Sequence, residues 1–283
     1  MILVMTLLVR NESDILSANL DYHLSQGIDH IIVTDNRSSD GTLDILSEYQ
    51  KNRNVTVLFE DSDNYSQGQW VTRMAQMAIH EFQADWVINS DADEFWWPKV
   101  GTLKESIQDV SSDIGALYIN RTNFLPSNND NIEFYHRMII RENISLNIHG
   151  NPLPPKVCHR GFEDVEIHVG NHDITTSHKH SRMQFENVEI LHYPLRVYKQ
   201  FEMKIKFGGS ALERNTELPT EIGSTWRKLY KEYMAGKLEQ YYNTQIPDDT
   251  ILSKGLADGS LVEDTRLSHY MQNLKDKMNL ASY

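Results

Sequence analysis

Cysteine is nearly absent from this chain of 283 residues, which contains only Cys158. A single cysteine excludes an internal disulfide and a cysteine-rich zinc module, and it favours a reducing, cytoplasmic location. Long hydrophobic runs are also missing, because the apolar run of residues 1–9 ends at Arg10 and is too short to span a bilayer. That run lacks the basic leader and cleavage site of a secretory signal. We therefore expect a buried strand there and no integral membrane segment.

Positive charge is scarce, since 27 basic side chains stand against 40 acidic ones and the formal net charge is -13. A surface of that sign repels nucleic-acid phosphates and anionic lipid headgroups, so we expect no nucleic-acid partner. Glycine-rich phosphate motifs are missing as well, because the sequence has neither a Walker A pattern nor a GxGxxG fingerprint. An anionic substrate would therefore need another local source of positive charge.

The first half of the chain alternates short apolar runs with helical patterns, which is the order of a parallel sheet covered by helices on both faces. A helix capped by Asp40 is expected between the second and third strands. The sequence thus predicts an α/β fold, an αβα sandwich with a mostly parallel central sheet. The expected strands are residues 2–9, 28–34, 55–59 and 86–88, and further helices are expected over 13–26 and 69–82.

The pattern is less regular after residue 95. Thr102 and Glu105 form a capping box that predicts a short helix. The polar segments 123–131 and 151–155 are expected to be loops over one end of the sheet, where they would influence the choice of acceptor. Further strands are expected over residues 115–120, 157–159, 165–169 and 188–191, and further helices over 196–207 and 224–242.

Two carboxylates, Asp91 and Asp93, directly follow the apolar strand 86–88. Ligands bind at the carboxyl ends of strands in open α/β sheets, and two carboxylates there can share one divalent cation. Mg²⁺ or Mn²⁺ suits such a pair, because these ions keep several waters and are completed by substrate phosphates. The alternative is an acidic turn that simply closes the strand.

A second polar turn, residues 35–42, lies between the second strand and its helix. Asp35 at the strand end could hold the ribose or base of a nucleoside. The alternative is an ordinary turn in which Asp40 caps the following helix. The first turn, residues 10–13, has no glycine that would make a phosphate nest, so a metal would have to neutralise more of a phosphate's charge.

These motifs together resemble a known family. Residues 6–12, 35–42 and 91–95 resemble, in that order, family 2 glycosyltransferases of the GT-A fold, and residues 170–173 and 191–196 with Lys204 and Gly208 look like a bacterial subgroup of it. The resemblance implies a UDP- or GDP-type nucleotide-sugar donor, a glycan or other hydroxyl acceptor, and an inverting transfer. It also implies Mn²⁺ or Mg²⁺ on Asp91 and Asp93, with His192 as the first choice of third ligand and His172 as the second.

The resemblance and the motifs suggest roles for individual residues. Inverting transfer needs a base that takes the proton of the acceptor hydroxyl. Asp173 is the leading candidate because it adjoins the motif at residues 170–172, and Asp164, Glu94 and His172 complete the catalytic set. The residues expected to contact the donor are Leu8, Arg10, Asn11, Glu12, Asp35, Asn36, Asp40, Gln69, Arg73, Ser90, Asp91, Ala92, Asp93, Arg196 and Lys204.

We expect a glycosyltransferase domain over residues 1–209, with the nucleotide-sugar side in 1–95 and the acceptor side in 96–209. Residues 210–283 are expected to form a helical C-terminal extension. Two other functions fit part of the pattern: a sugar-nucleotide or carbohydrate-binding module without activity, and a phosphatase or phosphotransferase with Asp91 as nucleophile. Glu94 and Phe95 argue against the phosphatase, because a small residue and then Thr or Val usually follow its second Asp.

Overall fold

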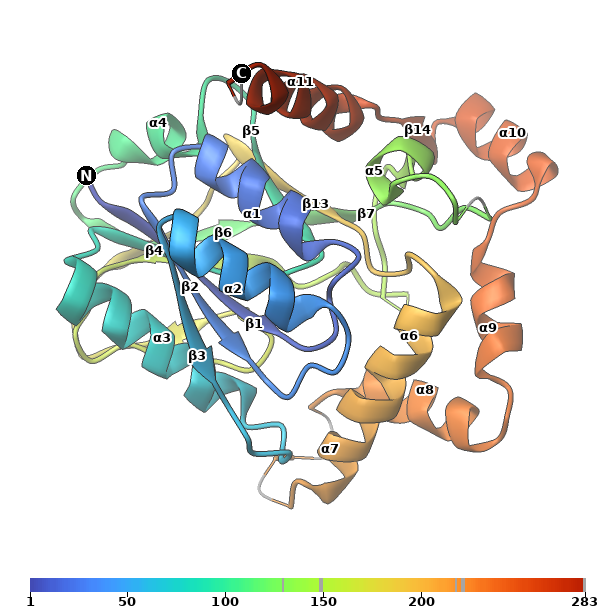
Figure 1. The fold of residues 1–283 in the computed structure, drawn as a ribbon, viewed down its shortest axis with the longest axis horizontal. Helices are drawn as coiled ribbons and strands as arrows, with labels where there is room; N and C mark the ends of the chain where they lie inside the picture. The colour runs from blue at the N-terminus through green and yellow to red at the C-terminus, as the bar shows by residue number, and fades with distance from the viewer. Residues whose placement is uncertain (129, 148–149, 217, 220–221, 282–283) are drawn as a thin grey trace.

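A seven-stranded sheet forms the centre of the molecule, with the strand order β12-β6-β9-β4-β1-β2-β3 (Figure 1). The computed structural model describes residues 1–128, 130–147, 150–216, 218–219 and 222–281. Six of the strands run in one direction and β9 alone is antiparallel to its neighbours. The expected α/β fold with a mostly parallel central sheet is therefore confirmed.

The first half of the chain consists of three βα units and a fourth strand, as predicted. α1 begins three residues later than expected because residues 12–15 form a turn in which the Glu12 carbonyl accepts from the amides of Ile15 and Leu16. The elements are β1 (Leu3–Val9), α1 (Leu16–Ser25), β2 (His30–Asp35), α2 (Thr42–Asn52), β3 (Val55–Phe59), α3 (Gln67–Phe82) and β4 (Trp86–Asp91).

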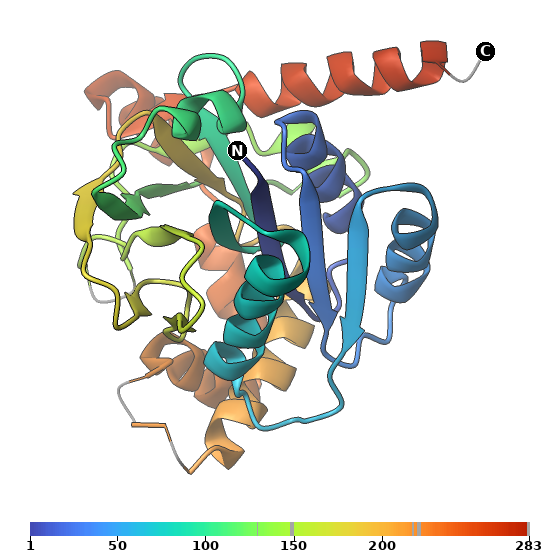
Figure 2. The same ribbon diagram turned by 90° about the vertical axis from the view of Figure 1, so that its left-hand side faces the viewer.

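Alternate side chains of β1 enter two different cores, as a strand with helices on both faces requires. Leu3, Met5 and Leu7 pack with α1 and α2 in the main core. Val4 packs with α3 in a second core on the opposite face. Figure 2 shows α2 and α3 on opposite sides of the sheet, so the predicted αβα layers are present.

The middle of the chain adds the antiparallel strand and three small sheets. β9 (Lys156–Arg160) lies between β4 and β6 (Ile114–Ile119). The small sheets are β5-β13-β7, β10-β11 and β14-β8. Their bounds, with the remaining elements of this region, are β5 (Glu94–Pro98), α4 (Leu103–Gln108), β7 (Arg121–Asn123), α5 (Phe134–Arg137), β8 (Ile140–Glu142), β10 (Glu166–Ile167), β11 (Ile174–Thr175), β12 (Ser181–Gln184), β13 (Val188–His192) and β14 (Leu261–Glu263).

The helix-capping signals of the sequence are present in the structure in part. The capping box of Thr102 and Glu105 is present at the start of α4. Asp40 does not cap α2, because the cap residue is Gly41 and the Asp40 carboxylate instead accepts from the amides of Ser13 and Thr42. The predicted loop 123–131 includes residue 129, which lies outside the described residues.

The C-terminal part is mostly helical and contributes to the main core. Residue 209, the predicted domain boundary, lies inside a continuous helical stretch made of α6 (Tyr198–Lys204), the π-helical turn η1 (Ile205–Gly209) and α7 (Ser210–Arg214). Leu267 and Met271 of α11 (Arg266–Ala281) belong to the main core, and α11 packs beside α1 (Figure 1). Between α7 and α11 the chain forms α8 (Ser224–Met234), α9 (Leu238–Gln245) and α10 (Asp249–Asp258). No helix in the described ranges is long and apolar enough to cross a membrane.

Candidate functional site

A cavity of about 250 Å³ lies where β1, β2 and β4 end. The helical stretch of α6, η1 and α7 and one residue of α8 close its other side. Its walls are formed by Leu8, Val9, Arg10, Glu12, Asn36, Tyr65, Gln67, Trp70, Asp91, Ala92, Asp93, Arg121, Lys156, Gly170, His172, Met203, Lys204, Phe207, Gly208, Ala211 and Trp226. Motifs far apart in the sequence thus meet at one edge of the sheet, where open α/β folds bind ligands.

The turns after β1 and β2 are joined by hydrogen bonds. The Asn11 amide donates to Ser38 Oγ at 2.9 Å, and Asn11 Oδ1 accepts from the Ser39 amide at 2.7 Å. Asn11 has φ 57 and Arg37 has φ 60, a left-handed conformation that is uncommon for residues other than glycine. Strained backbone of this kind persists only where the surroundings hold it, and it gathers at binding sites.

Asp91 ends β4 and faces a buried lysine that the sequence analysis did not single out. Lys156 Nζ lies 2.5 Å from Asp91 Oδ2, and Asn171 Nδ2 donates to Asp91 Oδ1 at 3.2 Å. Lys156 also lies 3.2 Å from Glu94 Oε1. Burial opposes ionisation of Asp91, but the Lys156 ammonium outweighs it and holds the pKa of Asp91 below its usual value. Asp91 is therefore a carboxylate at neutral pH.

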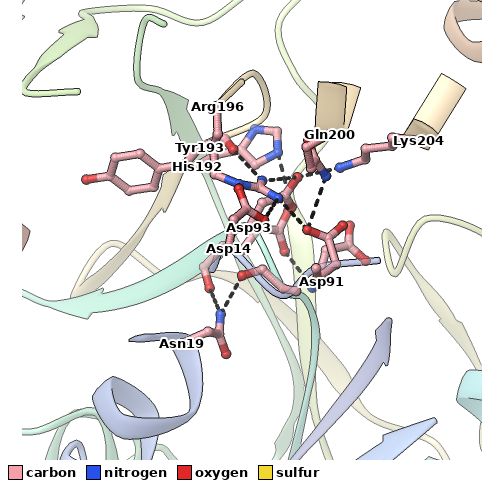
Figure 3. Close-up of polar contacts among 12 residues, drawn as sticks. Asp14, Asn19, Asp91, Asp93, His192, Tyr193, Arg196, Gln200 and Lys204 are labelled. Atoms are coloured by element: carbon pink, nitrogen blue, oxygen red, sulfur yellow. Dashed lines mark hydrogen bonds and ion pairs between the residues drawn. The ribbon is translucent and has the colours of Figure 1, made fainter. Parts of the chain in front are cut away.

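Asp93 lies in the turn between β4 and β5 and has three basic neighbours (Figure 3). Its Oδ2 is 2.5 Å from Lys204 Nζ and 3.9 Å from Arg196 Nη1, and its Oδ1 is 3.6 Å from His192 Nε2. Burial would raise the pKa of Asp93, yet Lys204, His192 and Arg196 together hold it well below the usual value. Asp93 is thus ionised although it is buried.

Arg196 is fully buried and connects three acidic side chains beneath the cavity (Figure 3). Its guanidinium lies 2.5 Å from Glu12 Oε2, 2.6 Å from Asp14 Oδ2 and 3.9 Å from Asp93 Oδ2. Burial raises the pKa of Glu12 to about 7, although Arg196 and Lys204 act to lower it. Arg196 itself does not line the cavity, so it supports the acidic residues and does not contact a ligand there.

The basic groups near the cavity floor are already paired with acidic ones. The acidic members are Glu12, Asp14, Asp91, Asp93 and Glu94, and the basic members are Arg121, Lys156, Arg196 and Lys204. A bound diphosphate would add negative charge to a cluster in which basic groups do not outnumber acidic ones, so it would need further positive charge. Two carboxylates next to an open cavity fit Mg²⁺ or Mn²⁺, because such ions are completed by waters and substrate phosphates.

A third protein ligand is not in place for that cation. Among the described residues no group of three His, Cys, Asp or Glu side chains is arranged to hold a metal ion. His192 Nδ1 lies 2.7 Å from Asn123 Oδ1, and His192 does not line the cavity. His192 Nε2 nevertheless lies 3.6 Å from Asp93 Oδ1, so the expected set of Asp91, Asp93 and His192 stays a prediction. The two carboxylates are the residues that fit a cation.

Three of the predicted base candidates lie away from the cavity surface. Asp173 accepts from Tyr118, Arg182 and the Ile174 amide, and it does not line the cavity. Asp164 is exposed and accepts from Thr176 Oγ1 and the Ser177 amide. Glu94 is inaccessible to solvent, with Oε1 beside Arg121 and Lys156 and Oε2 accepting from the Asp91 amide. His172 is the one member of the catalytic set that lines the cavity.

The structure separates the predicted donor residues into two groups. Arg73 pairs with Glu60 at 3.4 Å, and Gln69 is exposed. Asp35 is buried, with Oδ1 accepting from the Ser38 amide and no partner at Oδ2 among the described residues. The predicted donor residues that line the cavity are Leu8, Arg10, Glu12, Asn36, Asp91, Ala92, Asp93 and Lys204, and those that do not are Asn11, Asp35, Asp40, Gln69, Arg73, Ser90 and Arg196.

The cavity residues that the sequence analysis did not single out include Tyr65, Arg121, Lys156 and Trp226. Lys156 had a visible signal, since it is a charged residue that opens an apolar strand directly after the proline-rich segment. Arg121 and Trp226 had no such signal in the sequence, because each reaches the cavity through the packing of segments that are far apart in the sequence. Tyr65 has φ 55, and its ring lies 6.3 Å from that of Trp226.

The family model of glycosyltransferase family 92 matches residues 5–251. No curated protein matches the chain by sequence. The match is to family 92, whereas the sequence motifs resemble family 2, so the family 2 assignment is not confirmed. The prediction that the protein is a glycosyltransferase is confirmed.

Among solved structures, the chain is similar to S. aureus TarS 1-349 in complex with UDP at 14% identity and a TM-score of 0.45, over 83% of this chain and 71% of that one. It is also similar to glucosyl-3-phosphoglycerate synthase from Mycobacterium tuberculosis in complex with Mn²⁺, UDP and glucosyl-3-phosphoglycerate, at 12% identity and a TM-score of 0.37, over 88% and 81%.

Proposed function

The chain belongs to glycosyltransferase family 92, and from this premise we propose that it transfers a sugar from a nucleoside-diphosphate donor bound in the cavity to a hydroxyl of a glycan or other acceptor. One observation carries the proposal: a single cavity is lined by Asp91, Asp93 and Lys204 and by the turns after β1 and β2. A nucleoside-diphosphate donor needs a polar turn for its nucleoside and positive charge for its phosphates. This edge of the sheet offers the turn, and a cation on the two carboxylates would supply the charge.

The nucleoside end of the donor is proposed to lie beside Arg10 and Asn36. Arg10 Nη1 donates to Asn36 Oδ1 at 3.3 Å, and the Arg10 guanidinium lies 4.5 Å from the centre of the Phe207 ring. This arrangement presents hydrogen-bonding groups and an aromatic ring near the strand ends. The diphosphate would then point toward Asp91, Asp93 and Lys204. UDP- and GDP-sugars both fit the description.

The cofactor in this proposal is Mn²⁺ or Mg²⁺ held by Asp91 and Asp93. When bound, the cation would supply the positive charge that this cluster lacks and would stabilise the leaving diphosphate. Lys204, already 2.5 Å from Asp93, is placed to hold a phosphate oxygen as well. We propose inversion at the anomeric carbon, in line with the resemblance of the motifs, and a cytoplasmic location in line with the single cysteine.

Donor binding tests the proposal directly. Isothermal titration of the chain with a panel of UDP- and GDP-sugars should show binding of at least one donor with Mn²⁺ present and a loss of at least tenfold in affinity when EDTA replaces the metal. Asp91→Asn should show the same loss with Mn²⁺ present, because it removes one of two charged ligands. Asp164→Asn, a matched change at an exposed carboxylate, should bind as the wild type does.

The products distinguish the other functions. Release of a nucleoside diphosphate supports transfer, release of inorganic phosphate supports a phosphatase, and tight binding without turnover supports a binding module. Affinity that is equal in Mn²⁺ and EDTA would contradict the metal part of the proposal. Absence of binding by every donor would contradict the proposal as a whole.

A further inference from the structure

Tyr65 lies in the segment between β3 and α3 and has a strained backbone. Its φ is 55, a left-handed conformation that is an outlier for a residue with a bulky side chain. Two contacts hold the residues before it: Asp63 accepts from Arg10 Nη1 at 2.8 Å, and the Asn64 carbonyl accepts from Asn215 Nδ2 at 2.6 Å. The helix α3 begins two residues after it. Tyr65 is thus fixed from both sides in a costly conformation, which indicates a role for its side chain.

The hydroxyl of Tyr65 is an unpaired polar group on the cavity wall. Tyr65 lines the cavity, and its ring lies 6.3 Å from the ring of Trp226 on the helical side. No residue in the described ranges forms a hydrogen bond with this hydroxyl. The oxygen is not one of the described polar atoms that are both without a partner and sealed from solvent, so it reaches open space.

Two charged groups of the cavity wall act on this hydroxyl. Burial raises the pKa of Tyr65, the charge of Asp91 raises it further, and the charge of Lys204 lowers it. Charges act strongly only over short distances, so the hydroxyl end of the ring points toward Asp91 and Lys204, which line the same cavity. The raised pKa keeps the hydroxyl protonated at neutral pH, and it can therefore donate a hydrogen bond there.

The lysines of this wall are each held by a carboxylate. Lys204 Nζ lies 2.5 Å from Asp93 Oδ2, and Lys156 Nζ lies 2.5 Å from Asp91 Oδ2. A phosphate bound to either lysine would have to share it with that carboxylate. The Tyr65 hydroxyl can donate to a phosphate without breaking a contact to any described residue, and it carries no charge that must be desolvated.

From this geometry we infer that Tyr65 donates a hydrogen bond from its hydroxyl to the phosphate that carries the donor sugar. The inference rests on the proposed function, in which the nucleoside lies beside Arg10 and Asn36. The phosphate bonded to the sugar is then the one nearer Asp91 and Lys204. That phosphate gains negative charge when its bond to the sugar breaks, so the hydrogen bond also stabilises the departing nucleoside diphosphate. Tyr65 thus makes the site prefer a diphosphate to a monophosphate.

Tyr65→Phe tests the inference, because it removes the hydroxyl and keeps the ring. Isothermal titration with Mn²⁺ present measures the affinities for UDP and UMP, or for GDP and GMP if the wild type binds GDP more tightly than UDP. We expect the affinity for the diphosphate to fall about 10- to 100-fold, as for a lost hydrogen bond to a charged group. The affinity for the monophosphate, which lacks the second phosphate, should stay within about twofold of the wild type.

Two further variants complete the experiment. Tyr49→Phe removes a hydroxyl that donates to the Ser17 carbonyl at 3.2 Å, and Tyr49 does not line the cavity, so both affinities should be unchanged. Tyr65→Gly removes both the ring and the hydroxyl and adopts the φ of 55 without strain. It should lower the affinity for the diphosphate at least as far as Tyr65→Phe does, and it serves if Tyr65→Phe does not fold.

The outcomes separate this inference from the proposed function. A diphosphate affinity that falls less than fivefold in Tyr65→Phe would overturn the inference alone. An equal loss of diphosphate and monophosphate affinity would also overturn it, because the hydroxyl would then act on the nucleoside end or on the fold. A wild type that binds neither UDP nor GDP would contradict the proposed function as well.

Discussion

At the scale of single residues, the site depends on charges that are buried in pairs. Arg196 is fully buried and holds Glu12, Asp14 and Asp93, none of which is adjacent to it in sequence. A buried pair gains little over an apolar one, but removal of one partner leaves a charge without compensation. Arg196 is therefore expected to matter more for stability than for direct contact with the donor.

Arg196→Met should lower the free energy of unfolding by about 3 to 5 kcal/mol, because Glu12 and Asp93 lose a partner that water cannot replace. Arg214→Met is the matched control, since the side chain of Arg214 is 51% exposed and its pair with Asp63 should contribute less than about 1 kcal/mol. Urea unfolding of the three proteins measures both effects. Equal losses for the two variants would contradict the role given to Arg196.

At the scale of elements, the cavity is closed by an irregular helix. α6 continues through the π-helical turn η1 into α7, and this turn presents Gly208 to the ring of Trp226 from α8. π-Helical turns often occur at functional sites. A Cβ at residue 208 would lie 2.3 Å from the Trp226 ring, so the glycine allows α8 to approach. The packing of one helix against another thus shapes the cavity wall.

Gly208→Ala should destabilise the chain by about 1 to 3 kcal/mol, because the new Cβ overlaps the Trp226 ring. The sign of the change in unfolding free energy is informative, because Gly→Ala in an unhindered helix stabilises by about 0.5 to 1 kcal/mol. The double variant Gly208→Ala with Trp226→Leu provides the control, because a smaller side chain leaves room for the Cβ. Unfolding in urea of the single and double variants gives their coupling. An additive double variant would show that the two residues do not compete for space.

At the scale of the whole molecule, the C-terminal segment is part of the fold. Leu267 and Met271 of α11 are buried in the main core with residues of β1 and α1. Trp226 of α8 lines the cavity, and β14 pairs with β8. The segment after residue 209 therefore completes both the core and the site, and it does not form an independent layer.

A chain that ends at residue 209 should fail to fold cooperatively, because it exposes the core surface that α11 covers and ends within a continuous helical stretch. Near-UV circular dichroism and thermal unfolding would show the loss as an absent or broad transition. Gln272→Ala, a change at an exposed position of α11, should keep the wild-type transition within a few degrees. A truncated chain that melts sharply at the wild-type temperature would contradict this expectation.

The sequence by itself determined the regular part of this protein. The apolar periods of residues 2–9 and 86–88 and the helices between them predict the parallel strands, and the pair Asp91 and Asp93 follows from its place after a buried strand. Such features are local, because a strand or helix buries a face that its own period defines. The edge of the sheet where the site lies and the acidic pair at that edge can therefore be predicted from the sequence.

Only the tertiary structure decided which groups face that pair. β9 enters the sheet antiparallel between β4 and β6, and this crossing brings Lys156 to Asp91. The turn between β10 and β11 places His172 on the cavity wall and leaves Asp173 bound to Tyr118 and Arg182. The sequence motif ranks Asp173 ahead of His172 as a candidate catalytic residue. Neighbouring residues in a turn point in different directions, and contacts between distant segments depend on how the chain packs. The acidic pair is thus written in the sequence, whereas its basic partners are set by the fold.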